Sequence, residues 1–110
     1  MKIQTSADLL DGIVLAIVEC HDYYGYALTQ RVQQVIDISE STMYPVLRRL
    51  KKDGYLTTYD HPYHGRNRRY YRLTPQGQKH LNQIRQLWQQ YETSLDHVFN
   101  DYQGGDEDRG

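Results

Sequence analysis

The stretch HGRNRRYYRLT, from His64 to Thr74, concentrates side chains that bind polyanions. It holds four arginines and two tyrosines, in a 110-residue chain whose formal net charge is −1. Between residues 48 and 72, eight basic side chains stand against two acidic ones, so the rest of the chain is acidic. Such a contrast indicates a local surface for a polyanion such as nucleic acid. The alternative is a solvated surface whose basic side chains pair with acidic residues of the same chain.

A second candidate site surrounds the single tryptophan, Trp88. It belongs to an apolar row spaced by three and four residues, which consists of Leu81, Ile84, Trp88, Tyr91, Leu95, Val98 and Tyr102. This spacing, kept over three heptads, predicts that the first six of these residues form a dimer interface between two helices, although packing within one subunit is the alternative. Two facing indoles would form a flat slot for an aromatic ligand, with Ile84, Tyr91 and Leu10 beside it. Alternatively, Trp88 only holds the dimer together.

Other chemistries have weaker support in the sequence. His61 and His64 form the one HxxH, and Cys20-His21-Asp22 follows the first predicted helix, but no CxxC is present, so a metal sensor is a minor alternative. Cys20 is expected to be a small buried residue rather than a redox switch. No phosphate-binding glycine loop, nucleophile elbow or HExxH occurs, so we predict no enzyme and no cofactor. One cysteine and no long apolar run favour a cytoplasmic protein without a membrane span.

Six elements are predicted to position these residues. The first helix is expected at residues 7–19 with Thr5 or Ser6 as N-cap, and the second at 26–35 after a turn at 21–26. The third should run from Ser39 or Ser41 to Gly54, and the last from Thr74-Pro75 to about Asn100. Between these two helices, strands at 55–59 and 68–73 are joined by the loop DHPYHGRN. The order predicts a mainly α fold with a small β-hairpin. We assign a winged helix-turn-helix DNA-binding domain to residues 1–73, a dimerisation helix to 74–102 and a disordered tail to 103–110.

The third helix is predicted to read DNA. Met43, Val46, Leu47 and Leu50 should face inward, whereas Ser41, Thr42, Tyr44, Arg48 and Lys51 should face the DNA. Arg48 can reach a phosphate or a guanine edge. Pro45 favours a first helical turn close to Ser41. The alternative for Tyr44 is that it lies half-buried under the wing.

Alternation along the second strand divides its side chains between two faces. Tyr71 and Leu73 are expected to face the core, and Arg68, Tyr70 and Arg72 the outside. Arg69 falls on the inward face, so we expect it to bridge to an acidic residue rather than to DNA.

The segment SESTMYPVLRRLKKDGYL followed by GRNRRYYRLTPQG resembles the PadR family of winged-helix transcriptional regulators, and YYGYALTQRV is similar to the family's second helix. The resemblance covers roughly residues 7–100, and the single C-terminal helix resembles the compact subfamily. It implies a homodimer that binds an inverted-repeat operator, represses transcription and, in some members, is released by phenolic acids or flat aromatic drugs. It places Tyr44 and Arg48 in the recognition helix, Gly65, Arg66, Asn67 and Arg68 in the wing tip, and Trp88 at the tryptophan that lines a dimer cavity in multidrug-binding relatives. Tyr24 stands where the family often has histidine.

Together these features predict a ligand-responsive repressor whose third helices enter adjacent major grooves about one helical turn apart. The alternative function is an architectural DNA-binding protein without ligand control.

Overall fold

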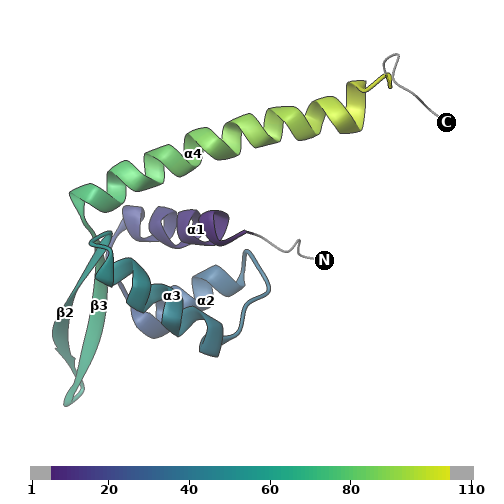
Figure 1. The fold of residues 1–110 in the computed structure, drawn as a ribbon. Helices are drawn as coiled ribbons and strands as arrows, with labels where there is room; N and C mark the ends of the chain where they lie inside the picture. Colours follow the sequence, from purple (N-terminus) through teal and green to yellow (C-terminus); the bar gives the residue numbers. More distant parts are fainter. Residues whose placement is uncertain (1–5, 105–110) are drawn as a thin grey trace.

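The computed structural model describes residues 6–104, which form four α-helices and one small antiparallel sheet (Figure 1). The elements in chain order are α1 (Ala7–Cys20), β1 (Tyr23–Tyr24), α2 (Gly25–Gln33), α3 (Glu40–Lys52), β2 (Leu56–Tyr63), β3 (Arg66–Leu73), α4 (Pro75–Asp96) and a π-helical turn, η1 (His97–Asp101). The predicted class, a mainly α winged helix-turn-helix with a long C-terminal helix, is confirmed. Thr5 and residues 105–110 of the predicted tail lie outside the described residues.

The ends of two helices follow directly from local capping. Ser6 is the N-cap of α1 and accepts a hydrogen bond from the backbone N–H of Leu9. Thr74 is the N-cap of α4, its Oγ1 accepts from Gly77 N at 2.9 Å, and Pro75 occupies the first helical position. Both starts agree with the sequence prediction because capping depends on residues close together in the chain.

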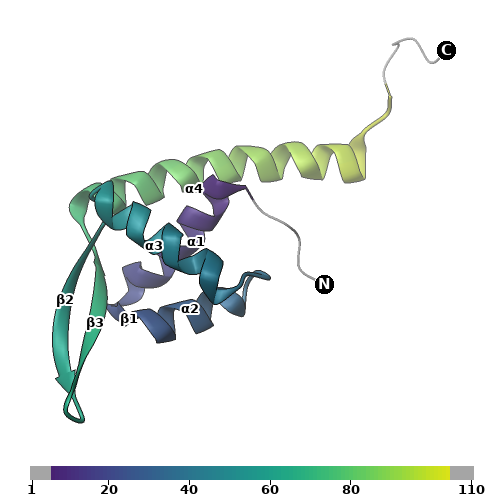
Figure 2. The same cartoon turned by 60° about the horizontal axis from the view of Figure 1, so that its bottom comes forward.

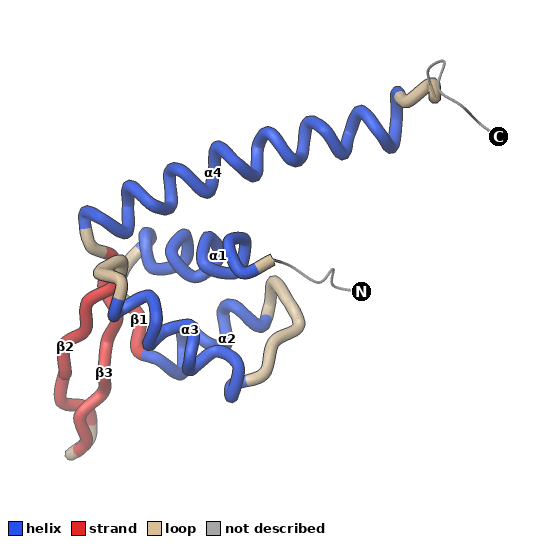
Figure 3. The backbone as a smooth tube through the Cα atoms, in the orientation of Figure 1, coloured by secondary structure: helices blue, strands red, loops and turns tan. Residues whose placement is uncertain are grey.

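The core is centred on α1, which lies between α4 on one side and α2 and α3 on the other (Figure 3). Its buried apolar residues come from the four α-helices, from β2 and, with Ile36, from the connection between α2 and α3: Val14, Leu15, Val18, Leu28, Val32, Ile36, Met43, Leu47, Leu50, Leu56 and Leu81. Each buried leucine or valine removes enough apolar surface from water to contribute about 1.5–3 kcal/mol. The core therefore fixes α3 against α1, with the opposite side of α3 turned to solvent.

The hairpin is longer than predicted and has a third strand. The strand order is β1-β3-β2, with Tyr24 paired to Tyr70 and Tyr63 paired to Arg66. Most of the predicted loop, DHPYHGRN, is therefore strand, and the connection is only His64-Gly65, with positive φ values of 50° and 78°. Positive φ at both turn residues matches the right-handed twist of a tight hairpin.

A local signal explains why the predicted hairpin is too short, and a non-local pairing explains the additional strand. Pro62 suggests a loop, but β2 lies at the edge of the sheet, where proline is tolerated. The two-residue strand β1, in the predicted turn at 21–26, forms only because β3 offers it a partner. The resulting wing projects away from the helices (Figure 2).

The predicted bounds of α2 and the predicted place of Pro45 in α3 also need correction. α2 begins at Gly25 and ends at Gln33. Ser39 caps α3, so the helix starts at Glu40 and Pro45 falls in its second turn rather than its first. Proline there removes the bond to the carbonyl of Ser41. That loss is tolerated because both residues are exposed, so water can reach the carbonyl.

The first half of α4 packs on α1, and the second half extends past the rest of the molecule (Figure 1). The long axis of the structure consequently measures 68 Å against 29 and 21 Å for the other two. Within residues 6–104, no helix combines the length and the apolar character that crossing a bilayer requires.

Candidate nucleic-acid interface

The start of α3 is organised by a cluster of hydroxyl groups. Ser39 Oγ accepts a hydrogen bond from the backbone N–H of Thr42 at 3.2 Å. It also lies 3.0 Å from Ser41 Oγ and 2.9 Å from Thr42 Oγ1. All three residues are exposed. Ser41 and Thr42, which were predicted to contact DNA, thus stand at an exposed helix start whose geometry Ser39 fixes.

The two sides of α3 differ in burial as its amphipathic pattern predicts. Met43, Leu47 and Leu50 are buried, and Val46 is half-buried. Tyr44, Arg48 and Lys51 are exposed on the other side, and the guanidinium carbon of Arg48 lies 5.0 Å from the centre of the Tyr44 ring. Tyr44 is 62% exposed, so the alternative that it lies half-buried under the wing is wrong.

Three of the eight basic residues between 48 and 72 are paired with acids of the same chain. Arg49 binds Asp11, Arg69 lies 3.6 Å from Asp60, and Arg72 lies 3.2 Å from Asp22. The expectation that Arg69 bridges to an acidic residue is confirmed. The remaining five, Arg48, Lys51, Lys52, Arg66 and Arg68, have no acidic partner within residues 6–104. Within this segment, the unneutralised positive charge therefore lies on α3 and on the outer part of the wing.

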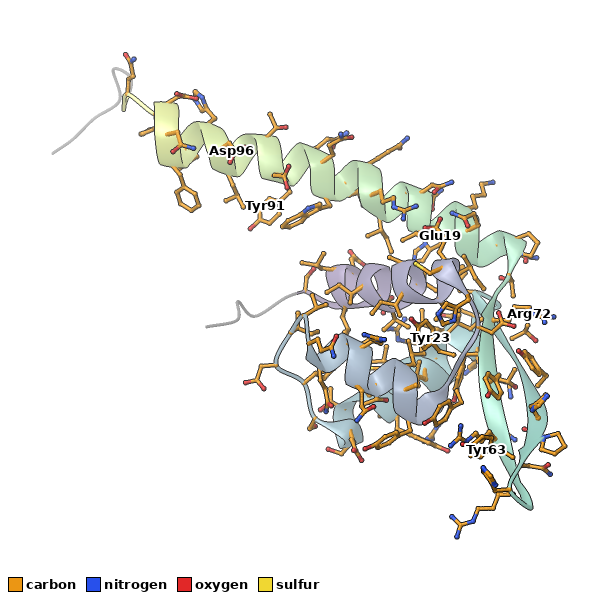
Figure 4. The ribbon with its side chains drawn as sticks, turned by 180° about the vertical axis from the view of Figure 1, so that it is seen from behind. Glu19, Tyr23, Tyr63, Arg72, Tyr91 and Asp96 are labelled. Atoms are coloured by element: carbon orange, nitrogen blue, oxygen red, sulfur yellow. The ribbon has the colours of Figure 1, made fainter. Side chains whose placement is uncertain are left out.

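Asp22 organises the base of the wing. Its Oδ2 accepts hydrogen bonds from the Tyr59 hydroxyl at 2.7 Å and from Arg72 Nε at 3.2 Å. The bond to the carboxylate raises the pKa of the Tyr59 hydroxyl above its usual value. Arg72 also lies over the Tyr59 ring, 4.8 Å from its centre. Arg72 thus lies on the exposed outer face at the base of the wing, as alternation predicts (Figure 4), but its charge is paired with Asp22 of the same chain.

The wing tip presents basic and aromatic groups around an open cavity. The cavity is lined by Tyr63, His64, Arg66, Asn67 and Arg68. Arg66 and Asn67 are exposed immediately after the turn at Gly65. Arg68 is only half-exposed because its guanidinium lies between the rings of Tyr24 and Tyr63, at 4.0 and 3.5 Å from their centres. Tyr63 was missed from sequence because it was assigned to a loop.

A crevice of about 230 Å³ lies between α2, α3 and Tyr71 of β3. It is lined by Gly25, Tyr26, Thr29, Glu40, Tyr44, Leu47 and Tyr71. Burial raises the pKa of the Tyr71 hydroxyl, and the nearby Tyr44 adds to this rise. Tyr26 is 58% exposed beside the crevice and was not among the predicted site residues. The sequence offered only one indication of Tyr26, its position at the start of the predicted second helix.

A second cavity, of about 190 Å³, lies between α1 and the middle of α4. Ser6, Asp8, Leu9, Ile84, Leu87, Trp88 and Tyr91 line it. The structure thus brings together Trp88, Ile84 and Tyr91, three of the four predicted effector-binding residues, and Tyr91 points to the side of α4 on which α1 lies (Figure 4). Leu10 is not part of the cavity: it packs on the core, and Leu9 takes the expected place.

The apolar row, which runs along α4 and on through η1 to Tyr102, divides at this cavity. Leu81 and Ile84 are 1% and 6% exposed and pack within the chain. A Cβ at Gly12 of α1 would lie 2.7 Å from Ile84 Cγ2, so glycine permits the close approach of the two helices. Farther along, Leu95 is half-buried and Trp88, Tyr91 and Val98 are exposed, as are Phe99 and Tyr102.

Cys20 and the histidines do not form a reactive cluster. Cys20 is exposed, which corrects the expectation that it is buried. The buried residues of α1 include Val18, and Cys20 lies about 200° around the helix from it, on the opposite side. Among residues 6–104, no three His, Cys, Asp or Glu side chains converge as a metal site requires.

A helix pair of the α2–α3 type, packed on α1 and followed by a two-stranded hairpin, defines a winged helix-turn-helix protein. Residues 14–83 match the model of the transcriptional regulator PadR-like family, and the chain belongs to this family.

Three relatives are similar over much of this architecture. A Streptococcus mutans UA159 protein of known crystal structure is 40% identical in sequence to this chain, with a TM-score of 0.87 over 96% of this chain and 100% of that one. A PadR family transcription regulator from Clostridium difficile R20291 is 26% identical, with a TM-score of 0.76 over 83% of this chain and 98% of that one. A transcriptional regulator of Mycobacterium tuberculosis is 38% identical over 66 residues, which are 59% of this chain and 62% of that protein.

Proposed function

We propose that this regulator binds an inverted-repeat operator as a homodimer and represses transcription, and that a planar aromatic or phenolic small molecule releases it from DNA. The observation that carries the proposal is the distribution of unpaired charge. Arg48 and Lys51 on α3 and Arg66 on the wing have no acidic partner among the described residues, in a chain of net charge −1. Regulators of this family bind DNA and are typically dimeric, which supports the same conclusion.

The roles of the two basic groups differ. Tyr44 and Arg48 lie on the solvent side of α3, where they can enter a major groove and read base edges. Arg66 and Asn67 follow a tight turn at the end of the wing, where they can hold phosphates or reach the minor groove. In a dimer, two copies of α3 would enter adjacent major grooves about one helical turn apart.

The dimer is proposed to form through α4. Its exposed apolar residues from Trp88 onward have too little of their own chain to cover them, and a second α4 has the matching three-four spacing. Leu81 and Ile84, which were also predicted at the interface, are already buried against α1. The interface would therefore be centred on Trp88, Tyr91, Leu95 and Val98.

The proposed effector site is the cavity at Trp88. Its indole lies 5.8 Å from the Tyr91 ring at an angle of 71°, and both side chains line the cavity and are exposed to solvent. A flat ligand stacked between two such indoles would favour one separation of the subunits. If that separation misplaces the two copies of α3 relative to the operator, ligand shifts the population towards free protein.

Competition binding tests the DNA-binding proposal. A labelled fragment of the promoter upstream of the chain's own gene is bound at fixed salt and displaced with the same fragment or with scrambled DNA. A specific regulator gives a ratio of affinities of roughly 10³ or more. Nearly equal competition would instead indicate the architectural alternative, which predicts sequence-tolerant binding with strong salt dependence.

Two further measurements test the finer claims. Transcription from that promoter in a purified system should fall when the protein is added, and no change would reject the repressor role. Emission from Trp88, the one tryptophan of the chain, should respond when planar aromatics or phenolic acids are titrated. A broad panel without any response would remove the effector site.

A further inference from the structure

The outer face of the wing carries a continuous stack of aromatic and arginine side chains. Register and alternation place Thr57, Tyr59, His61 and Tyr63 of β2, Arg66, Arg68, Tyr70 and Arg72 of β3, and Tyr24 of β1 on this face. Neighbouring planar groups are 3.5–5.9 Å apart from Arg72 through Tyr59, Tyr70, Tyr24 and Arg68 to Tyr63. The stack runs from the anchor at Asp22 towards the wing tip.

The wing needs such a support because its outer half is only two strands wide. β1 pairs with Tyr70 and Tyr71 alone, so β3 between Arg66 and Arg69 has a partner on one side only. An isolated two-stranded hairpin is marginally stable in water. Beyond Tyr70, β1 gives this outer half no backbone pairing. The position of the outer half relative to α3 therefore depends on side-chain contacts that cross from the helices to the hairpin.

Tyr24 is the residue that makes this crossing. It is the N-cap of α2, so its backbone is continuous with the helix-turn-helix, and in β1 it pairs with Tyr70 of the hairpin. Its ring lies 5.9 Å from Tyr70 and 6.4 Å from Tyr26, and the Arg68 guanidinium lies 4.0 Å from its centre. It is the one ring in the stack that does not belong to the hairpin itself.

Arg68 is the group that Tyr24 holds. Tyr63 covers the opposite side of the same guanidinium at 3.5 Å, so both faces of the cation are occupied by aromatic rings. Each such contact contributes a favourable cation–π interaction. With both faces covered, the N–H groups along the edge remain to donate in one fixed plane, which suits bidentate recognition of a phosphate.

We propose that Tyr24 is a positioning residue for DNA recognition: its ring braces the wing against α2 and holds Arg68 in a fixed plane, although Tyr24 itself contacts no DNA. The proposal rests on the proposed DNA-binding function. It assigns a role to a position that the sequence left open. The bracing requires the aromatic ring and not the hydroxyl group.

The test compares Tyr24→Ala and Tyr24→Phe with the unchanged chain, first without DNA. Two rings facing a guanidinium shift its NMR signals upfield, and a braced turn gives high heteronuclear NOE values. We expect Tyr24→Ala to lose much of the upfield shift of Arg68 and to lower the NOE values of His64, Gly65 and Arg66. Tyr24→Phe should preserve both. His61→Ala is the matched control, since it removes a ring that touches Tyr70 and lies opposite Arg68 on the same face, but it leaves in place both tyrosine rings that face the Arg68 guanidinium.

The second arm measures affinity for the promoter fragment. Tyr24→Ala should weaken binding by about tenfold, whereas Tyr24→Phe and His61→Ala should change it by less than about threefold. An unchanged Arg68 signal in Tyr24→Ala would overturn the bracing, and equal losses for Ala and Phe would overturn the requirement for the ring. An altered Arg68 signal with unchanged affinity would overturn the positioning role. If the unchanged chain binds no DNA, the proposed function fails, while the first arm still decides whether Tyr24 braces the wing.

Discussion

Arg49 of α3 holds the carboxylate of Asp11 of α1 with both arms of its guanidinium, at 3.0 and 2.5 Å. The Asp11 side chain is 6% exposed and that of Arg49 is 44% exposed. The hydrogen bonds to the carboxylate raise the pKa of Arg49 above its usual value. Since α1 also lines the cavity at Trp88, this ion pair joins the helix beside the proposed effector site to the helix proposed to read DNA.

Loss of Arg49 should destabilise the fold. Arg49→Leu leaves the buried Asp11 carboxylate without its partner, and an uncompensated buried charge is costly. Because the Arg49 side chain is partly exposed, water can partly solvate the Asp11 carboxylate in the variant. We therefore expect a fall of about 2–3 kcal/mol in the free energy of unfolding. Urea denaturation followed by circular dichroism measures it.

The neighbouring residue provides the control for this prediction. Arg48 is exposed and has no acidic partner within residues 6–104, so Arg48→Leu should change the free energy of unfolding by no more than about 0.5 kcal/mol. Equal stability of the two variants would contradict a structural role for the Asp11–Arg49 pair.

The contact between Glu19 and Arg85 should make stability depend on pH. Hydrogen bonds from Arg85 at 2.7 and 3.0 Å and from Gln78 at 2.6 Å lower the pKa of Glu19 to about 2, from 4.5. A folded-state pKa below the unfolded value gives stability that is present above pH 4.5 and is lost as the pH falls towards 2. Because the pair is partly exposed, we expect about 1 kcal/mol.

The variant Glu19→Gln isolates this contribution from the other carboxylates. The difference in unfolding free energy between the unchanged chain and the variant should be constant above about pH 5 and should vanish near pH 2. Urea denaturation at a series of pH values gives the difference directly. A difference that does not vary with pH would show that the Glu19 charge does not stabilise the fold.

The features predicted correctly from sequence depend on neighbouring residues. Caps at Ser6 and Thr74 and the two sides of α3 follow from short-range spacing, and these features place Tyr44 and Arg48 on the solvent side. The pairing of Arg49 with Asp11 could not be predicted, because the two residues are 38 positions apart and meet only after α1 and α3 pack.

The sequence predictions that differ from the structure have equally specific causes. α1 is apolar on nearly every side, and adjacent residues differ by about 100° around a helix, so the pattern could not decide whether Leu9 or Leu10 faces Trp88. In the wing, Pro62 and Gly65 indicate a loop locally, whereas pairing with β3 extends the strand to Tyr63. The sandwich around Arg68 depends on that extension and was therefore not foreseen.

Substitution in η1, which continues the distal end of α4, should weaken self-association. Val98 is 53% exposed and follows Trp88 and Tyr91 in the three-four row, so Val98→Asp would place a charge in the proposed interface. We expect the dimer dissociation constant to rise by at least about tenfold, as measured by sedimentation equilibrium. Gln90→Asp, which introduces the same charge on another side of the helix, is the control. Identical dissociation constants for the two variants would place the interface elsewhere.

Arg66 and Arg48 should differ in how they affect DNA binding. Arg66 lies exposed beside the turn of the wing, where a phosphate contact acts equally on all sequences. Arg66→Ala should weaken binding to operator and scrambled DNA alike and reduce the slope of log affinity against log salt by about one.

Arg48→Ala should instead reduce discrimination at one base pair by about 1–3 kcal/mol. Fluorescence anisotropy at several salt concentrations, repeated with single base-pair substitutions, separates the two effects. A salt slope unaffected by Arg66→Ala would refute its phosphate contact, and an intact sequence preference in Arg48→Ala would show that Arg48 does not read a base.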